Sequence, residues 1–231
     1  EVLLNTDAER VEEDSQGNIT LHVSTSDGQR VLSGSHLLLA VGRVPNTDSL
    51  NLDTAGIETY HHGYIKVNER VETNVEGIYA LGDVKGGPAF THVSYDDFRI
   101  VRANLLEGGD ASTADRTLTY TVFTDPQLGR AGLTEAMARD QGHDIRVAKM
   151  PMSHVSRALE VDEPRGVMKA VVDAETDRIL GAAVLGLEGG EVASLLLVAM
   201  MGDLPYTALR NAMLPHPTLA EALNNLFASL D

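Results

Sequence analysis

A histidine near the C-terminal end lies between two prolines and precedes a carboxylate, in the stretch Leu-Pro-His-Pro-Thr-Leu-Ala-Glu at residues 214–221. Each proline fixes its own φ and restricts the residue before it, so the backbone at His216 is constrained. Glu221 falls on the first turn of a predicted helix, within reach of the imidazole. A histidine that is held rigidly and oriented by a carboxylate suits general acid–base catalysis.

The same residues also allow a purely structural interpretation. Thr218-Leu219-Ala220-Glu221 is a capping box, S/T-x-x-E, which could serve only to begin a helix over residues 218–229. His216 would then be an ordinary turn histidine. The spacing alone leaves both interpretations open.

The composition excludes several classes of protein. The 231 residues are 43% hydrophobic, and the formal net charge of −16 repels phosphate backbones, so nucleic acid is not expected as a partner. The longest apolar run, residues 192–201, is too short to span a bilayer, and no membrane partner is expected. Cysteine is absent, which excludes disulfides, cysteine metal sites and thiol catalysis in this stretch, and we assign no metal ligands. The chain begins at Glu1 rather than methionine, which favours a fragment or a processed chain, and a cytoplasmic location is the default.

Residues 1–43 are expected to form a β-meander. Short strands are predicted at residues 2–4, 19–25 and 29–32, with turns at residues 15–18 and 26–28. The continuous apolar run of residues 37–42, which ends at Gly42, predicts a strand buried on both faces. No G-x-G-x-x-G turn occurs, so a complete dinucleotide-binding fold is not expected.

A second candidate site follows the stretch Thr-Asn-Val-Glu-Gly-Ile-Tyr-Ala-Leu-Gly-Asp at residues 73–83. It predicts a short strand over residues 78–81, a turn at Gly82, and Asp83 just beyond the strand. Ligands of open α/β sheets bind at that edge, where a carboxylate can accept two hydrogen bonds from a polyol. The alternative is a solvated aspartate in a turn. A helix is predicted from about Thr91 to Leu106, and its N-terminal N–H groups favour electron-rich oxygens.

Residues 117–231 are predicted to form an α+β unit, with an antiparallel sheet and helices on one side of it. Strands are expected at residues 119–123, 145–150, 166–172 and 179–187, and helices at residues 134–141, 190–201, 205–213 and 218–229. The helix at residues 190–201 is apolar nearly all round. That pattern predicts a core helix, or a core helix that also faces a partner subunit.

Three of these motifs together resemble the flavin-dependent pyridine nucleotide–disulfide oxidoreductases, the family of lipoamide dehydrogenase, glutathione reductase and mercuric reductase. His-Pro-Thr-x-x-Glu is similar to the C-terminal signature of that family, and residues 73–83 are similar to its long and specific flavin-binding motif. Ala-Val-Gly-Arg-Val-Pro-Asn at residues 40–46 is similar to the crossover between its nucleotide and flavin domains, although a buried strand ended by Gly and Pro is an equal alternative. The resemblance covers the whole chain but only the C-terminal half of a family member.

The resemblance implies an α+β fold with a C-terminal dimerisation domain at residues 114–231. Residues 1–43 would end an NAD(P)-binding domain, and residues 44–113 would form the C-terminal part of an FAD-binding domain. It implies FAD and NAD(P)H as cofactors of the complete protein and leaves open whether this chain alone retains FAD. The cofactor-binding positions it implies are the ribityl ligand Asp83, the flavin contacts Ala89, Phe90, Thr91 and His92, and Gly42 beside the nicotinamide. His92 is given no catalytic role.

By the same resemblance, electrons would pass from NAD(P)H through FAD and an upstream cysteine pair to a disulfide or a metal ion, with lipoamide and mercuric ion as alternative substrates. His216 would be the acid–base and Glu221 its partner, and each His216 would reach the other subunit's flavin in a homodimer formed by residues 114–231. Residues 90–101 and 223–227 most resemble a bacterial branch of the family that reduces metal ions. The competing hypothesis is a non-catalytic dimerisation scaffold that binds no flavin, which better describes the chain in isolation.

Overall fold

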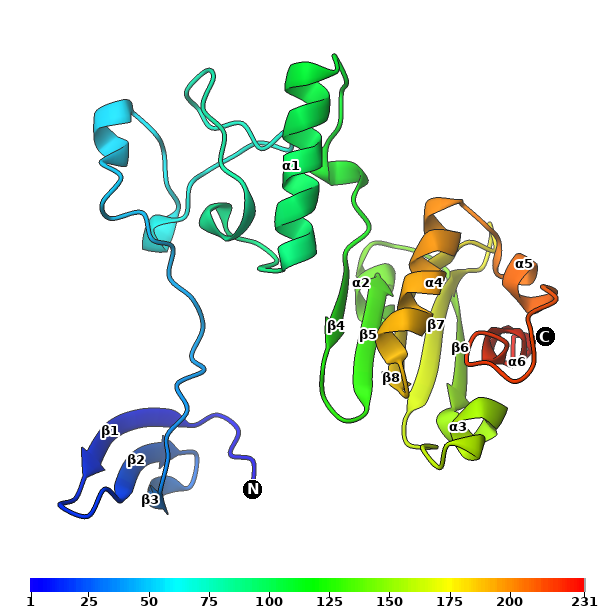
Figure 1. The fold of residues 1–231 in the computed structure, drawn as a ribbon, viewed down its shortest axis with the longest axis horizontal. Helices are drawn as coiled ribbons and strands as arrows, with labels where there is room; N and C mark the ends of the chain where they lie inside the picture. Colours follow the sequence, from blue (N-terminus) through cyan, green and yellow to red (C-terminus); the bar gives the residue numbers. More distant parts are fainter. Residues whose placement is uncertain (231) are drawn as a thin grey trace. The chain divides into compact units, whose positions relative to one another are not determined.

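The computed structural model describes residues 1–230 and divides them into two compact units (Figure 1). The first unit is Glu1–Asn46, and the second begins at Thr47. Most of the secondary structure, and the extensive hydrophobic core, belongs to the second unit.

The first unit is a three-stranded antiparallel sheet in the order β1-β2-β3. The strands are β1 Asp7–Glu13, β2 Ile19–Thr25 and β3 Gly28–Gly34. Thr25 pairs with Gly28 across a two-residue loop, which confirms the hairpin expected there.

The strand predicted at residues 2–4 is wrong, because the first strand forms at Asp7–Glu13. The Asp14 carboxylate accepts the Gln16 and Asn18 amides at 2.8 and 2.9 Å, and this turn brings Glu13 opposite Ile19. The segment directly before the turn is therefore the one that pairs. Its sequence carries no apolar alternation because every residue of β1 is exposed.

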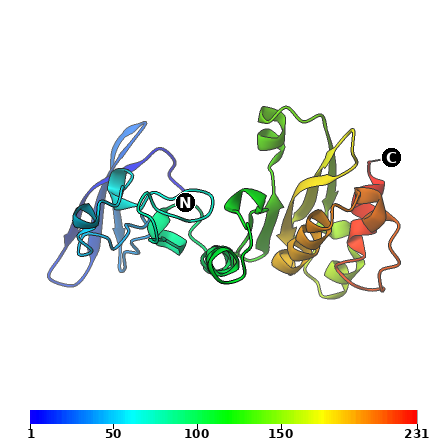
Figure 2. The ribbon, with the colours of Figure 1, turned by 90° about the horizontal axis from the view of Figure 1, so that it is seen from above.

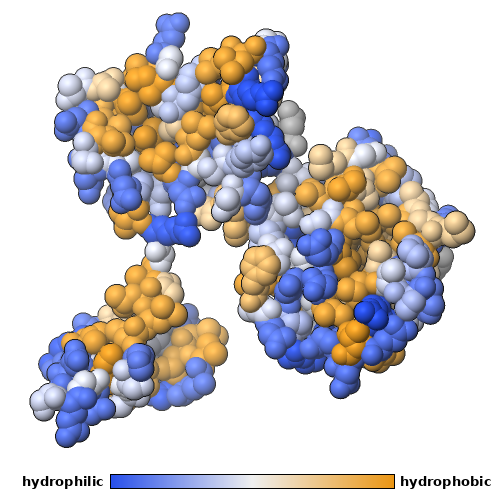
Figure 3. Space-filling view, viewed as in Figure 1, coloured by the Kyte–Doolittle hydropathy of each residue, from blue (hydrophilic) through white to orange (hydrophobic). Residues whose placement is uncertain are grey.

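The buried strand predicted at residues 37–42 is also wrong. Leu38, Leu39 and Val41 are 88%, 75% and 93% exposed, and no strand forms over these residues. Figure 3 shows hydrophobic surface around this segment. An apolar run becomes a buried strand only where neighbouring strands accept its hydrogen bonds and other layers cover it, and the three-stranded sheet of this unit does neither.

The second unit begins with irregular chain that leads to one long helix. The strand predicted at residues 78–81 is reduced to a single bridge between Glu72 and Tyr79. A tight 3₁₀ turn over Gly82–Lys85 follows, and then helix α1 runs over Thr91–Leu106, as predicted. Val93, Asp97 and Ile100 lie on the buried side of this helix.

The rest of the second unit is a five-stranded antiparallel sheet in the order β4-β5-β8-β7-β6. The strands are β4 Thr119–Val122, β5 Gln127–Gly132, β6 Ile145–Pro151, β7 Val167–Asp173 and β8 Ile179–Gly186. The four predicted strands are confirmed, whereas β5 was missed because its glycines hide the strand signal. Gly129 is needed there, because a Cβ at this position would overlap the Gly189 carbonyl oxygen at the start of α4.

Five further α-helices lie in the described part of the unit: α2 Glu135–Asp140, α3 Ser156–Glu160, α4 Gly189–Met201, α5 Tyr206–Arg210 and α6 Ala222–Ala228. Helix α5 is shorter than predicted and α6 begins later, because a turn at residues 219–221 comes before it. Residues of α3, α4, α5 and α6 share one core with the sheet, and Phe227, Leu223, Leu226, Leu196 and Met168 are wholly buried in it.

The expectation that helices cover only one face of the sheet is corrected by α2. Lys169 of β7 pairs with Glu135 of α2 at 2.6 Å. Along the strand Lys169 alternates with Met168 and Ala170, which belong to the core shared with α4 and α6. Helix α2 therefore lies over the opposite face, and Figure 2 shows the sheet between α2 and α4.

Candidate active site

The first candidate site is a contact between His216 and Glu221. His216 Nδ1 donates to Glu221 Oε1 at 2.8 Å, and Oε2 lies 3.0 Å away. The imidazole is 68% exposed, whereas the carboxylate side chain is 18% exposed. The carboxylate thus takes Nδ1, and Nε2 is the nitrogen available to exchange a proton with a substrate.

The chain before and after the histidine is held by neighbouring helices. The Asn224 amide, in α6, donates to the carbonyls of Leu209, Arg210 and Ala212 at 2.7, 3.1 and 3.1 Å. Thr218 Oγ1 donates to the Pro215 carbonyl at 2.8 Å. The His216–Pro217 peptide bond is cis. The chain before the histidine is therefore tied to α6, and the two sides of the histidine are tied to each other.

The capping interpretation is only half realised. Thr218 Oγ1 accepts the Glu221 amide at 3.2 Å, which is the threonine half of a capping box. In a full capping box the glutamate side chain would return to the threonine amide, but the Glu221 carboxylate is directed to His216 instead. The sequence S/T-x-x-E thus starts the turn and also orients the imidazole.

The second candidate site is the turn at Gly82–Lys85 together with the N-terminus of α1. Gly82 has φ +71°, and a Cβ there would lie 2.6 Å from Ser94 Oγ, so only glycine fits. Asp83 is exposed within this turn. Phe90 occupies the N-cap of α1 and supplies no side-chain cap to the amides of the first helical turn.

Residues 89–92 are anchored to the sheet by an aromatic stack. His92 Nε2 donates to the Thr119 carbonyl at 2.7 Å, which joins α1 to β4. The Phe90 ring is stacked with those of both His92 and Tyr120, with centroids 5.3 and 5.4 Å away. Ala89 and Thr91 remain exposed beside this stack. The ring of His92 is thus fixed by a backbone contact to β4.

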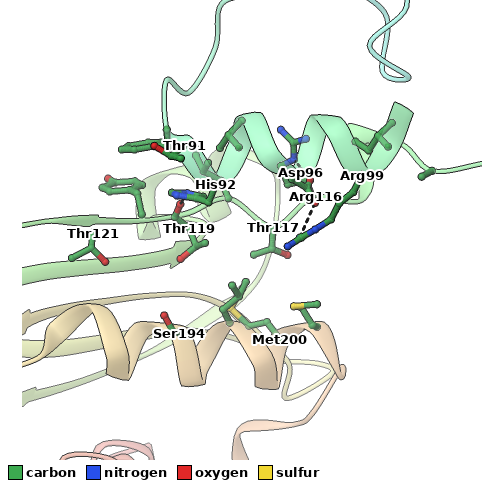
Figure 4. A pocket seen from close by; sticks show the side chains of 18 of the residues that line it. Thr91, His92, Asp96, Arg99, Arg116, Thr117, Thr119, Thr121, Ser194 and Met200 are labelled. Atoms are coloured by element: carbon green, nitrogen blue, oxygen red, sulfur yellow. Dashed lines mark hydrogen bonds and ion pairs between the residues drawn. The ribbon is translucent and has the colours of Figure 1, made fainter. Parts of the chain in front are cut away.

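A cleft of about 1170 Å³ opens beside this stack. Helix α1 and residues 111–112 and 116–118 form one side, and β4 and α4 form the other (Figure 4). Thr91 and His92 line it from α1, and Ser194 and Met200 line it from α4. Its walls therefore come from both the α1 segment and the five-stranded sheet.

The predicted site residues fall into three places. His216 and Glu221 are in contact; Asp83 and residues 89–92 lie at the two ends of one short connection; Gly42 lies in the first unit. Gly42 has φ +110°, with no atom within 4 Å of the position that a Cβ would take.

Sequence reasoning missed one buried carboxylate, Asp97, which lies in the turn of α1 next to the apolar residues Val93 and Ile100. Asp97 follows Val93 by four residues, on the side of the helix that also carries Ile100, so helical spacing could have predicted that this carboxylate is buried.

No three His, Asp or Glu side chains are grouped to hold a metal ion within residues 1–230. In the same described part of the chain, no helix has the length and apolar character needed to cross a membrane.

Comparisons with known proteins place this geometry in a class. The profile of the pyridine nucleotide-disulphide oxidoreductases matches residues 1–97, and that of the dimerisation domain of the same proteins matches residues 118–227. The chain belongs to this family of flavoprotein oxidoreductases.

Among individual relatives, the chain is 41% identical to the probable pyridine nucleotide-disulfide oxidoreductase RclA of Escherichia coli. The alignment extends over 229 residues, which are 99% of this chain and 51% of the relative. The solved copper(II) complex of the HOCl-induced flavoprotein disulfide reductase RclA superposes with a TM-score of 0.88 and 39% identity, over 97% of this chain and 50% of that one. A dihydrolipoyl dehydrogenase from Thermus scotoductus is 34% identical, over 89% of this chain and 44% of the relative. The chain thus spans about half the length of the curated relatives it matches.

Proposed function

We propose that this chain is the C-terminal half of an FAD-dependent pyridine nucleotide–disulfide oxidoreductase in which His216 is the acid–base. The observation that carries the proposal is the His216–Glu221 contact at 2.8 Å, with the imidazole 68% exposed on a firmly held loop. The class of reaction is supported by relatives that align with most of the chain. They are named as a pyridine nucleotide-disulfide oxidoreductase and a dihydrolipoyl dehydrogenase.

The residues around Asp83 fit an FAD-type ligand. Gly82 allows no side chain, so the backbone beside Asp83 is kept bare, and an exposed carboxylate there can accept hydroxyl hydrogen bonds. The uncapped N-terminus of α1 offers amide donors to electron-rich oxygens. Under the proposal Asp83 holds the ribityl hydroxyls, residues 89–92 lie against the ring, and Gly42 lies beside the nicotinamide. When bound, FAD supplies the transfer of electrons from NAD(P)H to a cysteine pair.

The work of this chain's own residues is then proton transfer. Glu221 holds the Nδ1–H of His216, so the ring keeps one orientation. Nε2 of the imidazole holds the second proton and delivers it to the thiolate that leaves when a substrate disulfide is reduced. In this proposal the electron acceptor is a disulfide, and a metal ion is the alternative.

A homodimer is the second part of the proposal. Val198 and Met201 of α4 are 67% and 73% exposed, although the opposite side of the same helix is buried in the core. Figure 3 shows hydrophobic surface over this part of the unit. An apolar helix face of this kind fits a partner subunit, and the matched family profile is that of a dimerisation domain. A cytoplasmic location belongs to the same proposal.

The first test is size-exclusion chromatography of the 231-residue chain with absorbance recorded at the protein and flavin bands. A colourless dimer supports the dimerisation role and assigns the rest of the flavin site to the other half of the protein. A yellow dimer means that the Asp83 turn retains FAD unaided. A colourless monomer contradicts the dimer.

The same measurement on the full-length protein separates the enzyme from the scaffold. We expect FAD to elute with the protein and to be reduced by NADH or NADPH. A full-length dimer that carries no flavin would support the non-catalytic scaffold and refute the oxidoreductase.

A further inference from the structure

We propose that Asp97 is a positioning residue that fixes the Gly82–Lys85 turn, and with it Asp83, and that Arg116 couples this turn to the five-stranded sheet. The inference rests on the proposed function, because it takes Asp83 to be the ligand that the turn presents.

Asp97 is the wholly buried carboxylate of α1, with 0% of its surface exposed. It lies on the buried side of the helix beside Val93 and Ile100, where the amphipathic pattern of a helix normally places an apolar residue. A carboxylate at such a position is tolerated only when cations and amides pair with its oxygens. Its partners therefore indicate what the residue does.

One carboxylate oxygen binds both ends of the turn. Asp97 Oδ2 accepts the Gly82 amide at 2.9 Å and pairs with Lys85 Nζ at 3.3 Å. Lys85 is itself largely buried, with 10% of its side chain exposed. Asp83 stands between these two anchored residues, and its carbonyl accepts the Gly86 amide at 3.0 Å. The backbone that carries Asp83 is thus held from the helix side.

The other carboxylate oxygen binds the segment that enters the sheet. Asp97 Oδ1 accepts Arg116 Nη2 at 2.6 Å, and Arg116 Nε donates to Asp96 Oδ2 at 2.7 Å. Figure 4 shows Arg116 reaching α1 beside Asp96. Two residues further on, the Leu118 carbonyl accepts the Gly132 amide of β5 at 2.8 Å. A single buried carboxylate therefore joins the Asp83 turn to the start of the sheet.

Asp96 provides a matched control, because it is the neighbouring aspartate and binds the same arginine. It has no contact with the turn in its hydrogen bonds and ion pairs, which go to Arg116 and Arg99. If the aspartates served only to hold α1 in place, replacing either one would have the same effect. If Asp97 positions the turn, only its replacement loosens Gly82.

The test is hydrogen exchange, followed by mass spectrometry, on the flavin-free full-length protein. We expect Asp97→Ala to speed exchange in peptides covering Gly82–Lys85 by about tenfold, since a buried hydrogen-bond partner is lost. Exchange at Leu133, which follows β5 and whose amide bonds the Leu180 carbonyl of β8, should stay unchanged. Asp96→Asn should leave both regions as they are. Equal acceleration in both regions, or none at the turn, overturns the inference.

Two further variants keep the test decisive if Asp97→Ala does not fold. Asp97→Asn keeps the shape and an acceptor oxygen but loses the ion pairs, so the turn should exchange faster than in the wild type and slower than in the alanine variant. Arg116→Gln should also speed exchange at Gly82–Lys85, because coupling runs through its guanidinium. An unchanged turn in Arg116→Gln refutes the coupling.

FAD titration of the full-length variants, followed by quenching of flavin fluorescence, connects the turn to the proposed function. Asp97→Asn should weaken FAD binding about tenfold while Asp96→Asn does not. A loosened turn with unchanged FAD affinity overturns the assignment of Asp97 to the flavin site. Failure of the wild type to bind FAD overturns the proposed function instead, and the exchange data then decide the positioning of the turn on their own.

Discussion

The contact between His216 and Glu221 predicts a variant with a large loss of activity and almost no loss of stability. The change is Glu221→Gln, which keeps the size of the side chain and the Thr218 contact to the residue 221 amide. The imidazole is 68% exposed and the carboxylate side chain 18% exposed, so water screens the pair from the histidine side. Exposed ion pairs contribute about 0.2–1 kcal/mol, so the free energy of unfolding should fall by less than about 1 kcal/mol.

The loss of activity should be far larger than that. General acid–base groups contribute about 10²–10⁴-fold in rate, and Glu221→Gln leaves the imidazole without the carboxylate that orients it. We expect disulfide-dependent oxidation of NAD(P)H by the full-length protein to fall by about 10²-fold, and by more in His216→Gln. FAD content should be unchanged in both variants.

Thr218→Ala is the comparison variant, because it removes the hydroxyl contacts to the Glu221 amide and the Pro215 carbonyl and keeps both the imidazole and the Glu221 carboxylate in the chain. Loss of a hydroxyl contact of the capping kind costs about 0.5–2 kcal/mol. It should therefore lower stability more than Glu221→Gln and lower activity less. The assays are urea unfolding followed by circular dichroism, since the chain has no tryptophan, and NAD(P)H turnover. If the two variants lose stability and activity in the same proportion, Glu221 is a capping residue and the acid–base assignment is refuted.

Three further predictions concern the second unit. Phe227→Ala, at a wholly buried ring 5.8 Å from that of Tyr206, should lower the free energy of unfolding by about 3–5 kcal/mol in urea, and a loss below about 1 kcal/mol would contradict the packing. The amide and the hydroxyl of Thr176, with a further contribution from His143, lower the pKa of Asp173 from 3.8 to about 2, so this carboxylate stabilises the fold above about pH 4 and the stabilisation is lost as the pH falls toward 2. Asp173→Asn should therefore be less stable than the wild type at pH 7, with a difference that shrinks between pH 4 and 2 in thermal unfolding; a difference independent of pH would refute the assignment. Val198→Glu, on the exposed side of α4, should convert the proposed dimer to a folded monomer in light scattering, and a persistent dimer would show that α4 is not the interface.

Prediction from the sequence succeeded where local signals and burial agree. Helix α1 was predicted with its observed bounds because a glycine-rich loop precedes it and Glu107-Gly108 ends it. Four strands of the five-stranded sheet were found because each is rich in β-formers. The His-Pro-Thr-x-x-Glu spacing predicted the contact that places Glu221 against His216.

Prediction failed where an element depends on what packs against it. Residues 37–42 have the composition of a buried strand, but a strand needs hydrogen-bonded neighbours, and residues 1–46 supply none for it. Strand β5 was not predicted because Gly129 is a weak strand former. Glycine is required there by the close approach of α4, which cannot be inferred from the neighbouring residues in the sequence. Which face of the sheet α2 covers could be assigned only from the structure, where Glu135 of α2 pairs with Lys169 of β7.

The sequence by itself therefore determined the family, the hairpin of the first unit, most of the second sheet, and the residue types available for proton transfer. These features follow from short-range spacing, periodicity and turn chemistry, which are properties of neighbouring residues. Only the tertiary structure decided that the Glu221 carboxylate turns to His216 instead of closing a capping box, and that Asp97 lies beneath the Asp83 turn with Lys85 and Arg116. Those contacts depend on which side chains are buried together, and burial is a property of the packed fold rather than of any stretch of sequence.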